Sequence, residues 1–565
     1  MSATGYLPHE REEPTAISMG TAMANEISAI HSAPEDAPSD HGHLEASLAN
    51  RLPPELLCQI FAIVRDTSGQ HHGRLGWVSL THVCHGWREI ALQDTLLWST
   101  IDMNTVRGRW LDERLSRSGS SPLSLTIEMP VAGELRTMDF NATAAEVAAR
   151  VIEGHSDRIQ TLVVFADLPK YLRTVNKLPF PALESLTFTA NFLRTDERGP
   201  RPEDVSAARV PLLRVLALAD IAFRWESAIY DNLVDLSLES VVKRERPSRE
   251  QLRGLFSRMT RLEMLRLFNF ALDDADHPPP SSKIHLPLSL KRLSSGADEC
   301  QDASIRDCFA FLKEMAVPPR ATTELSTFVA YYWDDEWSIW IEDVFSHHAL
   351  LLSPRALSVT VSKRKPPSLF TSEFPPVIEL SAFREPRAAC QSPDSVAPTL
   401  SGYWYIPFYT VTPWPVEIAG GHWHGVQLGN LAELDLYIAE ERDVEPCVQA
   451  LLPHLVNLRR LCGYEDTVLA VVQALRATPS LLPNLETICV GKGTRTATTE
   501  LFDRMVDFAL ERQGTKGALR ELHMPQEYVG VEGVGELSKV VPVVFGLPCT
   551  GEPKVRWSMC MAQHL

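Results

Sequence analysis

Residues 52–98, LPPELLCQIFAIVRDTSGQHHGRLGWVSLTHVCHGWREIALQDTLLW, decide the fold of the first part of this chain. Pro53 stands near the start, and proline suits the first turn of a helix, where its missing N–H costs no hydrogen bond. Leu56, Ile60 and Val64 then recur at every fourth position, which is the spacing of one helical face. The stretch therefore begins with an amphipathic helix, which a polar run ends.

The apolar pattern resumes after the polar run. Val83, Trp87 and Ala91 are again four residues apart and predict another amphipathic helix. Gly86 lies inside this helix, where glycine costs about 1 kcal/mol relative to alanine. A last apolar cluster, Leu96–Trp98, closes the stretch. We expect three short helices that carry more apolar side chains than so small a unit can bury within itself.

Three signatures occur here in order: Leu52-Pro53 opening a helix, a Val-Cys-x-x-Trp step at 83–87, and Leu97-Trp98 about ten residues later. In this order they resemble an F-box, and among F-box proteins the divergent ones of higher fungi. F-box domains are helical modules that dock on a Skp-type adaptor and, through it, on a cullin ubiquitin ligase. The resemblance implies that residues 51–98 form such a module.

The same resemblance implies which side chains contact the adaptor. We expect Trp87, the largest of them, to be the principal anchor, because tryptophan dominates interface energetics. The predicted adaptor-binding residues are Leu52, Pro53, Leu56, Ile60, Phe61, Leu80, Val83, Cys84, Trp87, Ala91, Leu97 and Trp98.

The composition is that of an acidic globular protein. Hydrophobic residues make up 44% of the 565 and charged residues 22%, and this length predicts more than one domain. The net charge of −18 argues against a nucleic-acid partner, because phosphates require a basic face. We therefore expect protein partners.

The cysteines indicate a reducing compartment. All ten are scattered without a CxxC pair or zinc-finger spacing, and Cys58, Cys84 and Cys489 lie within apolar patterns. The N-terminus lacks an apolar signal-peptide core, and no apolar run approaches the length of a membrane span. We expect an intracellular protein, in the cytoplasm, the nucleus or both, with no membrane contact.

The first 43 residues are predicted to be a disordered acidic tail. They contain seven acids against one base, with Pro, Ser, Ala and Gly between them. Such a composition cannot bury enough apolar surface to offset the entropy of an ordered chain.

A short L-x-x-L-x-L unit repeats through most of the remaining chain. Its full form appears at 183–193, where Asn191 follows the leucines as in leucine-rich repeats. The copies recur every 20 to 34 residues, the period at which strands stack into a solenoid with one continuous core. An ordinary α/β domain with several leucine-rich strands remains the alternative. The middle residues of the copies are Leu162, Leu186, Leu216, Leu236, Leu265, Leu293, Leu434, Leu461, Ile488 and Leu522.

Residues 300–425 break this rhythm and are rich in aromatic and proline residues. We interpret the span as an insertion between two parts of the repeat arch, 99–299 and 426–565. Its tryptophans either form a small core of their own or contact a substrate, because Trp supplies large contact area. The candidate substrate-binding residues are Trp333, Trp337, Trp404 and Trp414.

No motif for catalysis or cofactor binding was found. The sequence has no P-loop, GxSxG or HExxH motif, and we expect no cofactor and no catalytic residues. His422 and His424 would share one face of a strand and offer two metal ligands, but no further ligands are evident, so no metal site is predicted.

The expected fold is mixed α+β or α/β: a three-helix F-box followed by an irregular leucine-rich-repeat-like solenoid with the aromatic insertion. On the resemblance, the function is a non-catalytic substrate-recognition adaptor of a Skp–cullin–F-box ubiquitin ligase, leading to proteasomal degradation of an unknown protein. Two alternatives stay open. One is a repeat scaffold without ligase association, and the other is an enzyme with its active site in the insertion.

Overall fold

The structure is a computed structural model with two compact units, residues 1–92 and 93–565, which are taken in turn. The expected tail, 1–43, lies outside the residues that the structure describes. Those residues are 52–68, 76–103, 106, 108–128, 138–166, 168–190, 205–273, 283–298, 307–308, 311–328, 347, 354, 356–362, 377–383, 400–405, 422–423, 426–438, 441–491, 499–513, 518–531 and 533–546.

The first unit contains the two amphipathic helices predicted from the apolar spacing, α2 (Pro54–Ser68) and α3 (His85–Gln93). Between them lies a 3-10 helix, η2 (Gly76–His82), which the spacing did not predict and on which α2 packs. At the start of α2 the Pro53 carbonyl accepts hydrogen bonds from the N–H groups of Leu56 and Leu57. Glu55 lies in the first turn, where an acidic side chain complements the helix dipole.

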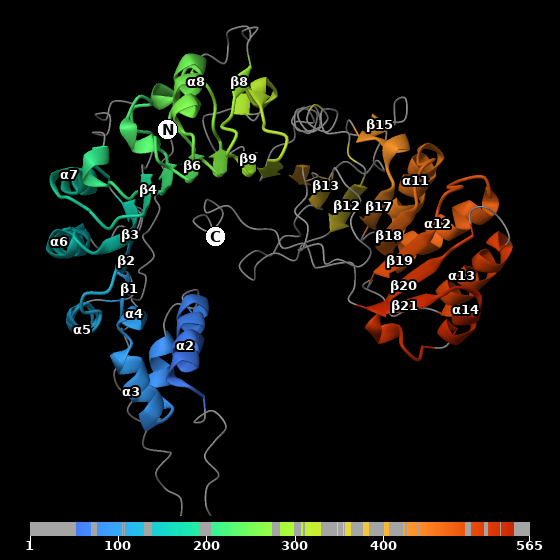
Figure 1. Cartoon of the computed structure of the whole chain (residues 1–565), viewed down its shortest axis with the longest axis horizontal. Helices are drawn as coiled ribbons and strands as arrows, with labels where there is room; N and C mark the ends of the chain where they lie inside the picture. The colour runs from blue at the N-terminus through green and yellow to red at the C-terminus, as the bar shows by residue number, and fades with distance from the viewer. Residues whose placement is uncertain are drawn as a thin grey trace, which may run out of the picture. The chain divides into compact units, whose positions relative to one another are not determined.

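Among the described residues, the second unit is built on one sheet of 17 strands (Figure 1). Every neighbouring pair runs parallel except where β13 meets β12 and β14. In spatial order the strands are β1 (Thr100–Asp102), β2 (Leu123–Glu128), β3 (Ile159–Ala166), β4 (Ser185–Ala190), β5 (Val215–Ala219), β6 (Asp235–Glu239), β7 (Met264–Phe268), β9 (Arg292–Asp298), β11 (Thr322–Phe328), β14 (Leu400–Tyr405), β13 (Val377–Phe383), β12 (Ala356–Ser362), β17 (Glu433–Ile438), β18 (Arg460–Tyr464), β19 (Thr487–Gly491), β20 (Glu521–Pro525) and β21 (Val543–Gly546).

The span 300–425, expected to interrupt the repeats, does not interrupt the sheet. Its strands β12, β13 and β14 enter in reverse order, with β14 beside β11 and β12 beside β17. These strands lack the L-x-x-L-x-L pattern, although the alternation of Leu357, Val359 and Val361 marks β12. The sheet continues through this span because hydrogen bonds between strands join backbone groups and need no particular side chain.

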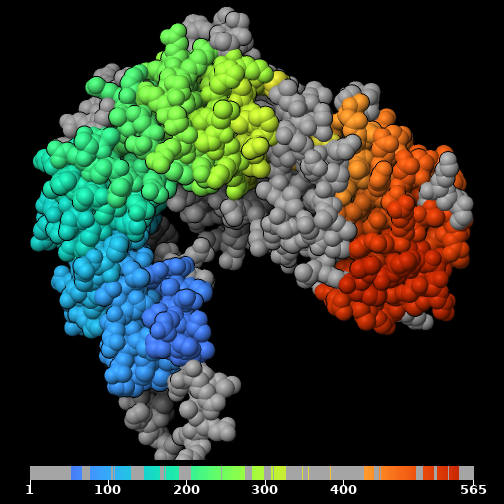
Figure 2. Space-filling view, viewed as in Figure 1, coloured from blue at the N-terminus to red at the C-terminus, as the bar shows by residue number. Residues whose placement is uncertain are grey.

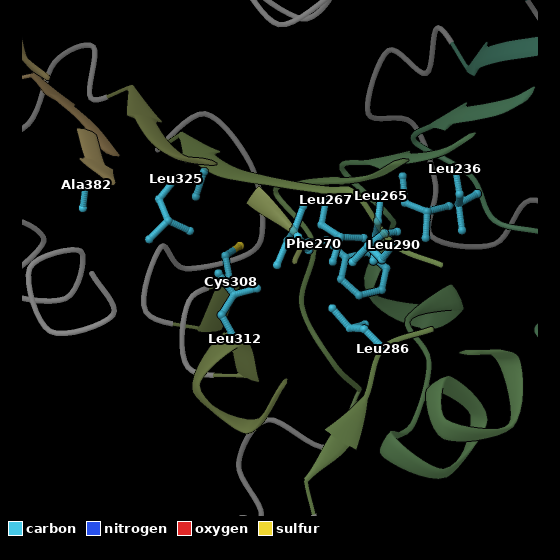
Figure 3. Packing of buried hydrophobic residues seen from close by; sticks show 14 of the residues in the cluster. Leu236, Leu265, Leu267, Phe270, Leu286, Leu290, Cys308, Leu312, Leu325 and Ala382 are labelled. Atoms are coloured by element: carbon cyan, nitrogen blue, oxygen red, sulfur yellow. The ribbon is translucent and has the colours of Figure 1, made fainter. Parts of the chain in front are cut away.

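The leucines of the repeat lie on one face of the sheet and form its core. Each predicted copy lies on or just before a strand, and the middle residues are direct neighbours across the ladder. Around β6, β7 and β9 these leucines pack with side chains from the returning segments, such as Phe270, Leu286 and Leu312 (Figure 3). The fold is thus a mixed helix and strand structure with a large, mostly parallel sheet.

Helices and turns return the chain between the strands. In the second half, α11, α12, α13 and α14 lie side by side along β17–β21 (Figure 1), and their side chains close over that face, orange to red in Figure 2. The α-helices of this unit that the structure describes are α4 (Thr95–Trp98), α5 (Arg109–Arg117), α6 (Met138–His155), α7 (Leu168–Lys177), α8 (Arg249–Arg258), α11 (Glu441–Leu451), α12 (Glu465–Ala477), α13 (Thr499–Arg512) and α14 (Val534–Val540). Within the described residues, no helix has both the length and the apolar character needed to cross a membrane.

Gly463 allows α12 to pack closely on the sheet. A Cβ at this position would lie 2.8 Å from the Leu436 carbonyl oxygen and 3.0 Å from Thr467 Cγ2. Opposite it, Val468, Val471 and Leu475 form one buried face of α12. The short distance between α12 and the sheet therefore leaves no room for a side chain at position 463.

A row of left-handed residues follows three neighbouring strands. Asp220, Ser240 and Asn269 have φ of 61°, 50° and 48°, and each directly follows β5, β6 or β7. Each donates its backbone N–H to a carbonyl of the next strand, and Asn269 Nδ2 donates to Ser240 Oγ at 3.4 Å. In the leucine-rich-repeat motif the polar residue comes one position later in the repeat than these three residues do. Asn191, the residue that matches the motif, lies outside the described part.

Candidate functional site

Helix α2 has two apolar faces, and only one of them is used internally. Leu57 and Phe61 are buried, at 2% and 0% exposure. Leu56 and Ile60, one position earlier in each turn, are 44% and 38% exposed. An amphipathic helix needs a single apolar face to pack, so the second face is available to a partner.

This second face forms a continuous stripe along the helix. Leu56, Ile60 and Ile63 are spaced by four and three residues, which keeps them within one narrow sector of the helix, and Leu52 lies just before its first turn. Ile63, at 62% exposure, was not among the predicted contacts, although its spacing from Ile60 is the signal that would have found it. We call this set the α2 stripe: Leu52, Leu56, Ile60 and Ile63.

Residues that precede α2 and α3 add to the exposed apolar surface. Val83 is 60% exposed, Pro53 is exposed, and Leu80 on η2 is half-buried. Contiguous exposed apolar surface is uncommon on a small helical unit unless a partner covers it.

Other predicted contacts lie inside the first unit. Ala91 is fully buried, and the rings of Phe61 and Trp87 pack at 5.3 Å with an interplanar angle of 57°. Trp87 is half-buried, and its Nε1 is shielded from solvent. This packing gives Phe61, Trp87 and Ala91 a part in holding α2 and α3 together.

Cys84 caps α3. Its Sγ accepts a hydrogen bond from the Trp87 N–H at 3.5 Å, and its carbonyl accepts one from the Arg88 N–H at 3.0 Å. The first contact satisfies an N–H group that the first turn of a helix leaves without an internal partner, and the second is the first hydrogen bond of the helix itself. The Val-Cys-x-x-Trp signature therefore contains a helix start as well as an exposed valine.

Leu97 and Trp98 belong to the second unit and are buried there, at 1% and 2% exposure. Asp94 caps their helix, α4, by accepting from the Leu96 and Leu97 N–H groups. The Arg117 guanidinium lies 5.0 Å from the Trp98 ring centroid, a cation–π distance. Both predicted contacts are thus part of a core beside β1.

Residues 49–104 match the family model described as F-box-like. No curated protein matches the chain. The match covers α2, η2, α3, α4 and β1, so it includes every predicted adaptor contact.

The family match bears on what this domain binds. Domains of this family imply binding to Skp-type adaptors and suggest a role in substrate recognition for ubiquitin ligases. They are typically found in non-catalytic adaptor subunits.

The predicted substrate contacts are only partly described. Trp333, Trp337 and Trp414 lie outside the described residues, while Trp404 lies on β14 opposite Ile378 of β13. Of the two histidines weighed as metal ligands, His424 is outside the described residues too, and His422 lies on the short strand β15 (His422–Trp423).

Proposed function

We propose that this protein is a substrate-recognition subunit of a Skp–cullin–F-box ubiquitin ligase. The observation that carries the proposal is the α2 stripe, an exposed apolar helix face within the segment that matches the F-box-like family. The protein would act in the cytoplasm, the nucleus or both, where ubiquitin ligases of this type work.

The proposed docking surface is narrower than the predicted set of twelve residues. The stripe, together with Pro53 and Val83, supplies exposed side chains, whereas Phe61, Ala91, Leu97 and Trp98 are buried and support the fold. Burying one Leu or Ile side chain contributes about 1.5–3 kcal/mol, against association costs of about 4–15 kcal/mol. Several stripe residues acting together are therefore needed for stable binding.

The second unit is proposed to present the substrate. Its parallel ladder with buried leucines supports a leucine-rich-repeat-like arch, and Trp333, Trp337, Trp404 and Trp414 stay the proposed substrate contacts. The chain itself would catalyse no bond change. It would raise the concentration of a substrate lysine near the charged conjugating enzyme, and the ubiquitinated substrate would be degraded.

The test is adaptor capture by the double variant Leu56→Glu/Ile60→Glu. Both side chains are exposed and glutamate is a good helix former, so α2 should stay folded while the stripe gains two charges. We expect adaptor recovery to fall at least tenfold, with an unchanged circular dichroism spectrum.

The matched control is Leu510→Glu on α13, a leucine 50% exposed in the second unit, which should leave adaptor recovery intact. Undiminished capture by the folded double variant would remove the stripe from the interface. If the wild-type chain recovers neither adaptor nor cullin, the alternative of a repeat scaffold without ligase association is favoured.

A further inference from the structure

Four side chains of distinct chemistry lie in one row on the sheet face opposite the leucines. Asp435 pairs with Cys462, Cys462 with Cys489, and Cys489 with His523 across β17, β18, β19 and β20. Their neighbours in sequence, such as Leu461 and Ile488, point into the leucine core, and side chains alternate along a strand. All four are buried, with exposures between 0% and 7%.

One buried arginine contacts this row, and the buried carboxylates of Glu433 and Asp435 lie near it. Arg460, 7% exposed, donates from Nε to Cys489 Sγ at 3.4 Å, and its Nη1 lies 3.6 Å from Glu433 Oε2. Burial acts to lower the pKa of Arg460, but the sulfurs of Cys462 and Cys489 and the Asp435 carboxylate outweigh it, so the pKa lies above its ordinary value. A guanidinium held against sulfur favours the thiolate, the reactive form of cysteine.

We propose that Cys462 and Cys489 form a dithiol site that a hydroperoxide oxidises reversibly to a disulfide. Neither cysteine is in a disulfide, and each is the direct lateral neighbour of the other on parallel strands. Adjacent strands lie about 4.8 Å apart, within the Cα–Cα range of about 4.4–6.8 Å that a disulfide spans. The inference is independent of the ligase function.

The chemistry balances with the hydroperoxide as the only co-reactant. The Cys489 thiolate attacks the terminal peroxide oxygen, the O–O bond breaks, and the alcohol, or water for hydrogen peroxide, leaves with a proton from solvent. The sulfenic acid formed on Cys489 is then attacked by the Cys462 sulfur. The S–S bond forms, water leaves, two electrons have passed from the thiols to the peroxide, and dithiothreitol restores both thiols.

A metal site explains the row less well. Among the described residues, no three His, Cys, Asp or Glu side chains are placed to share an ion. Asp435 and His523 are three strand spacings apart, about 14 Å, whereas ligands of one zinc ion lie within about 2.3 Å of it. The two central cysteines are the members of the row that can react with each other.

Burial determines which oxidants reach this site, and strand spacing determines how easily the disulfide is reduced. Cys462 and Cys489 are 0% and 1% exposed, so bulky thiol reagents are excluded, and a water-sized oxidant reaches them through local opening. Strand spacing holds the two Cβ atoms farther apart than the roughly 3.8 Å of an average disulfide. Such a bond is more easily reduced than a relaxed one.

The experiment treats the purified full chain with hydrogen peroxide, denatures it in an alkylating reagent and digests it with trypsin. Cleavage after Arg460, Arg476 and Lys492 places the two cysteines on separate peptides, 461–476 and 477–492. We expect the signal at the mass of the linked peptide pair to rise at least several-fold with oxidant and to disappear with dithiothreitol. Wild-type protein suffices, so the result does not depend on a variant that folds.

Cys447→Ser is the matched control, because Cys447 on α11 is also buried, at 6%, and should leave the linked pair unchanged. Cys462→Ser and Cys489→Ser should each abolish it. Recovery of both wild-type peptides alkylated, irreversibly oxidised or linked to other cysteines after the oxidant treatment would overturn the proposal.

Discussion

At the scale of single residues, the polar row after β5, β6 and β7 contains a titratable carboxyl group in a largely buried position. Asp220, Ser240 and Asn269 share a left-handed backbone, which asparagine and aspartate tolerate better than most residues. Ser240 and Asn269 are neutral and buried, while Asp220 brings a carboxyl to the same position. Burial, and then the neighbouring Glu239 carboxylate, raise the pKa of Asp220 to about 7.

This pKa predicts how stability depends on pH. The folded protein holds the Asp220 proton up to about pH 7, whereas the unfolded chain releases it near its ordinary value of 3.8. Stability is therefore lost as the pH rises from about 4 to 7, and the loss stays constant above that. Asp220→Asn should stabilise the fold by about 1–2 kcal/mol at pH 8, after a discount for partial solvent access, and little at pH 4.

Denaturant unfolding at both pH values measures this difference. The reverse exchange, Asn269→Asp, is the control: it should destabilise the fold at pH 8, because Asn269 is 1% exposed and donates to Ser240. A pH-independent effect of Asp220→Asn would show that the carboxyl is solvated in the folded state.

At the scale of elements, helix α2 shows what its sequence reveals and what it does not. The spacing of Leu56 and Ile60 correctly predicted an amphipathic helix, and the spacing of Val83, Trp87 and Ala91 predicted the next one, α3. Periodicity alone did not show which of two adjacent apolar rows faces inward, because Leu57 and Phe61 follow the same spacing. Their burial depends on where α3 lies, which is tertiary information.

Trp87 tests this division of roles. Its ring packs on Phe61 and its Nε1 donor is buried, so Trp87→Phe should keep most of the packing and cost less than about 1.5 kcal/mol. Trp87→Ala should cost about 3–5 kcal/mol by leaving a cavity beside Phe61. Stability is measured by chemical denaturation, and adaptor binding is measured in parallel.

If Trp87 is mainly internal, Trp87→Phe should keep adaptor binding within about threefold, because the α2 stripe is intact. A large loss of binding with full stability would instead return Trp87 to the role of anchor that its sequence position suggested.

At the scale of the whole molecule, the sequence predicted the strands better than their order. All ten predicted leucine-rich copies lie on or just before a strand, and each could be found because its pattern is local in the sequence. The return of β12, β13 and β14 into the same sheet in reverse order was not predictable from that pattern, because strand pairing is decided by backbone edges that a repeat search does not see. The F-box-like segment was found from three short signatures, but the exposure of Ile63 required the structure.

The continuity of the sheet leads to the last prediction. One cluster of buried side chains extends through the second unit from Ile101 to Val541, across the antiparallel strands. Leu216 on β5 and Leu461 on β18 are both 0% exposed and lie on opposite sides of those strands. Truncating either to alanine should cost about 2–5 kcal/mol.

Because the core is shared, both variants should lower the same calorimetric transition of the second unit. Stacked repeats are held by nearest-neighbour contacts, however, and long arrays can lose cooperativity at a weak junction. Two transitions, one lowered by Leu216→Ala and the other by Leu461→Ala, would place a junction between β5 and β18, a range that includes β12–β14, and divide the sheet into two folding blocks. A single transition lowered by both would show that the reversed strands couple the two parallel halves into one cooperative structure.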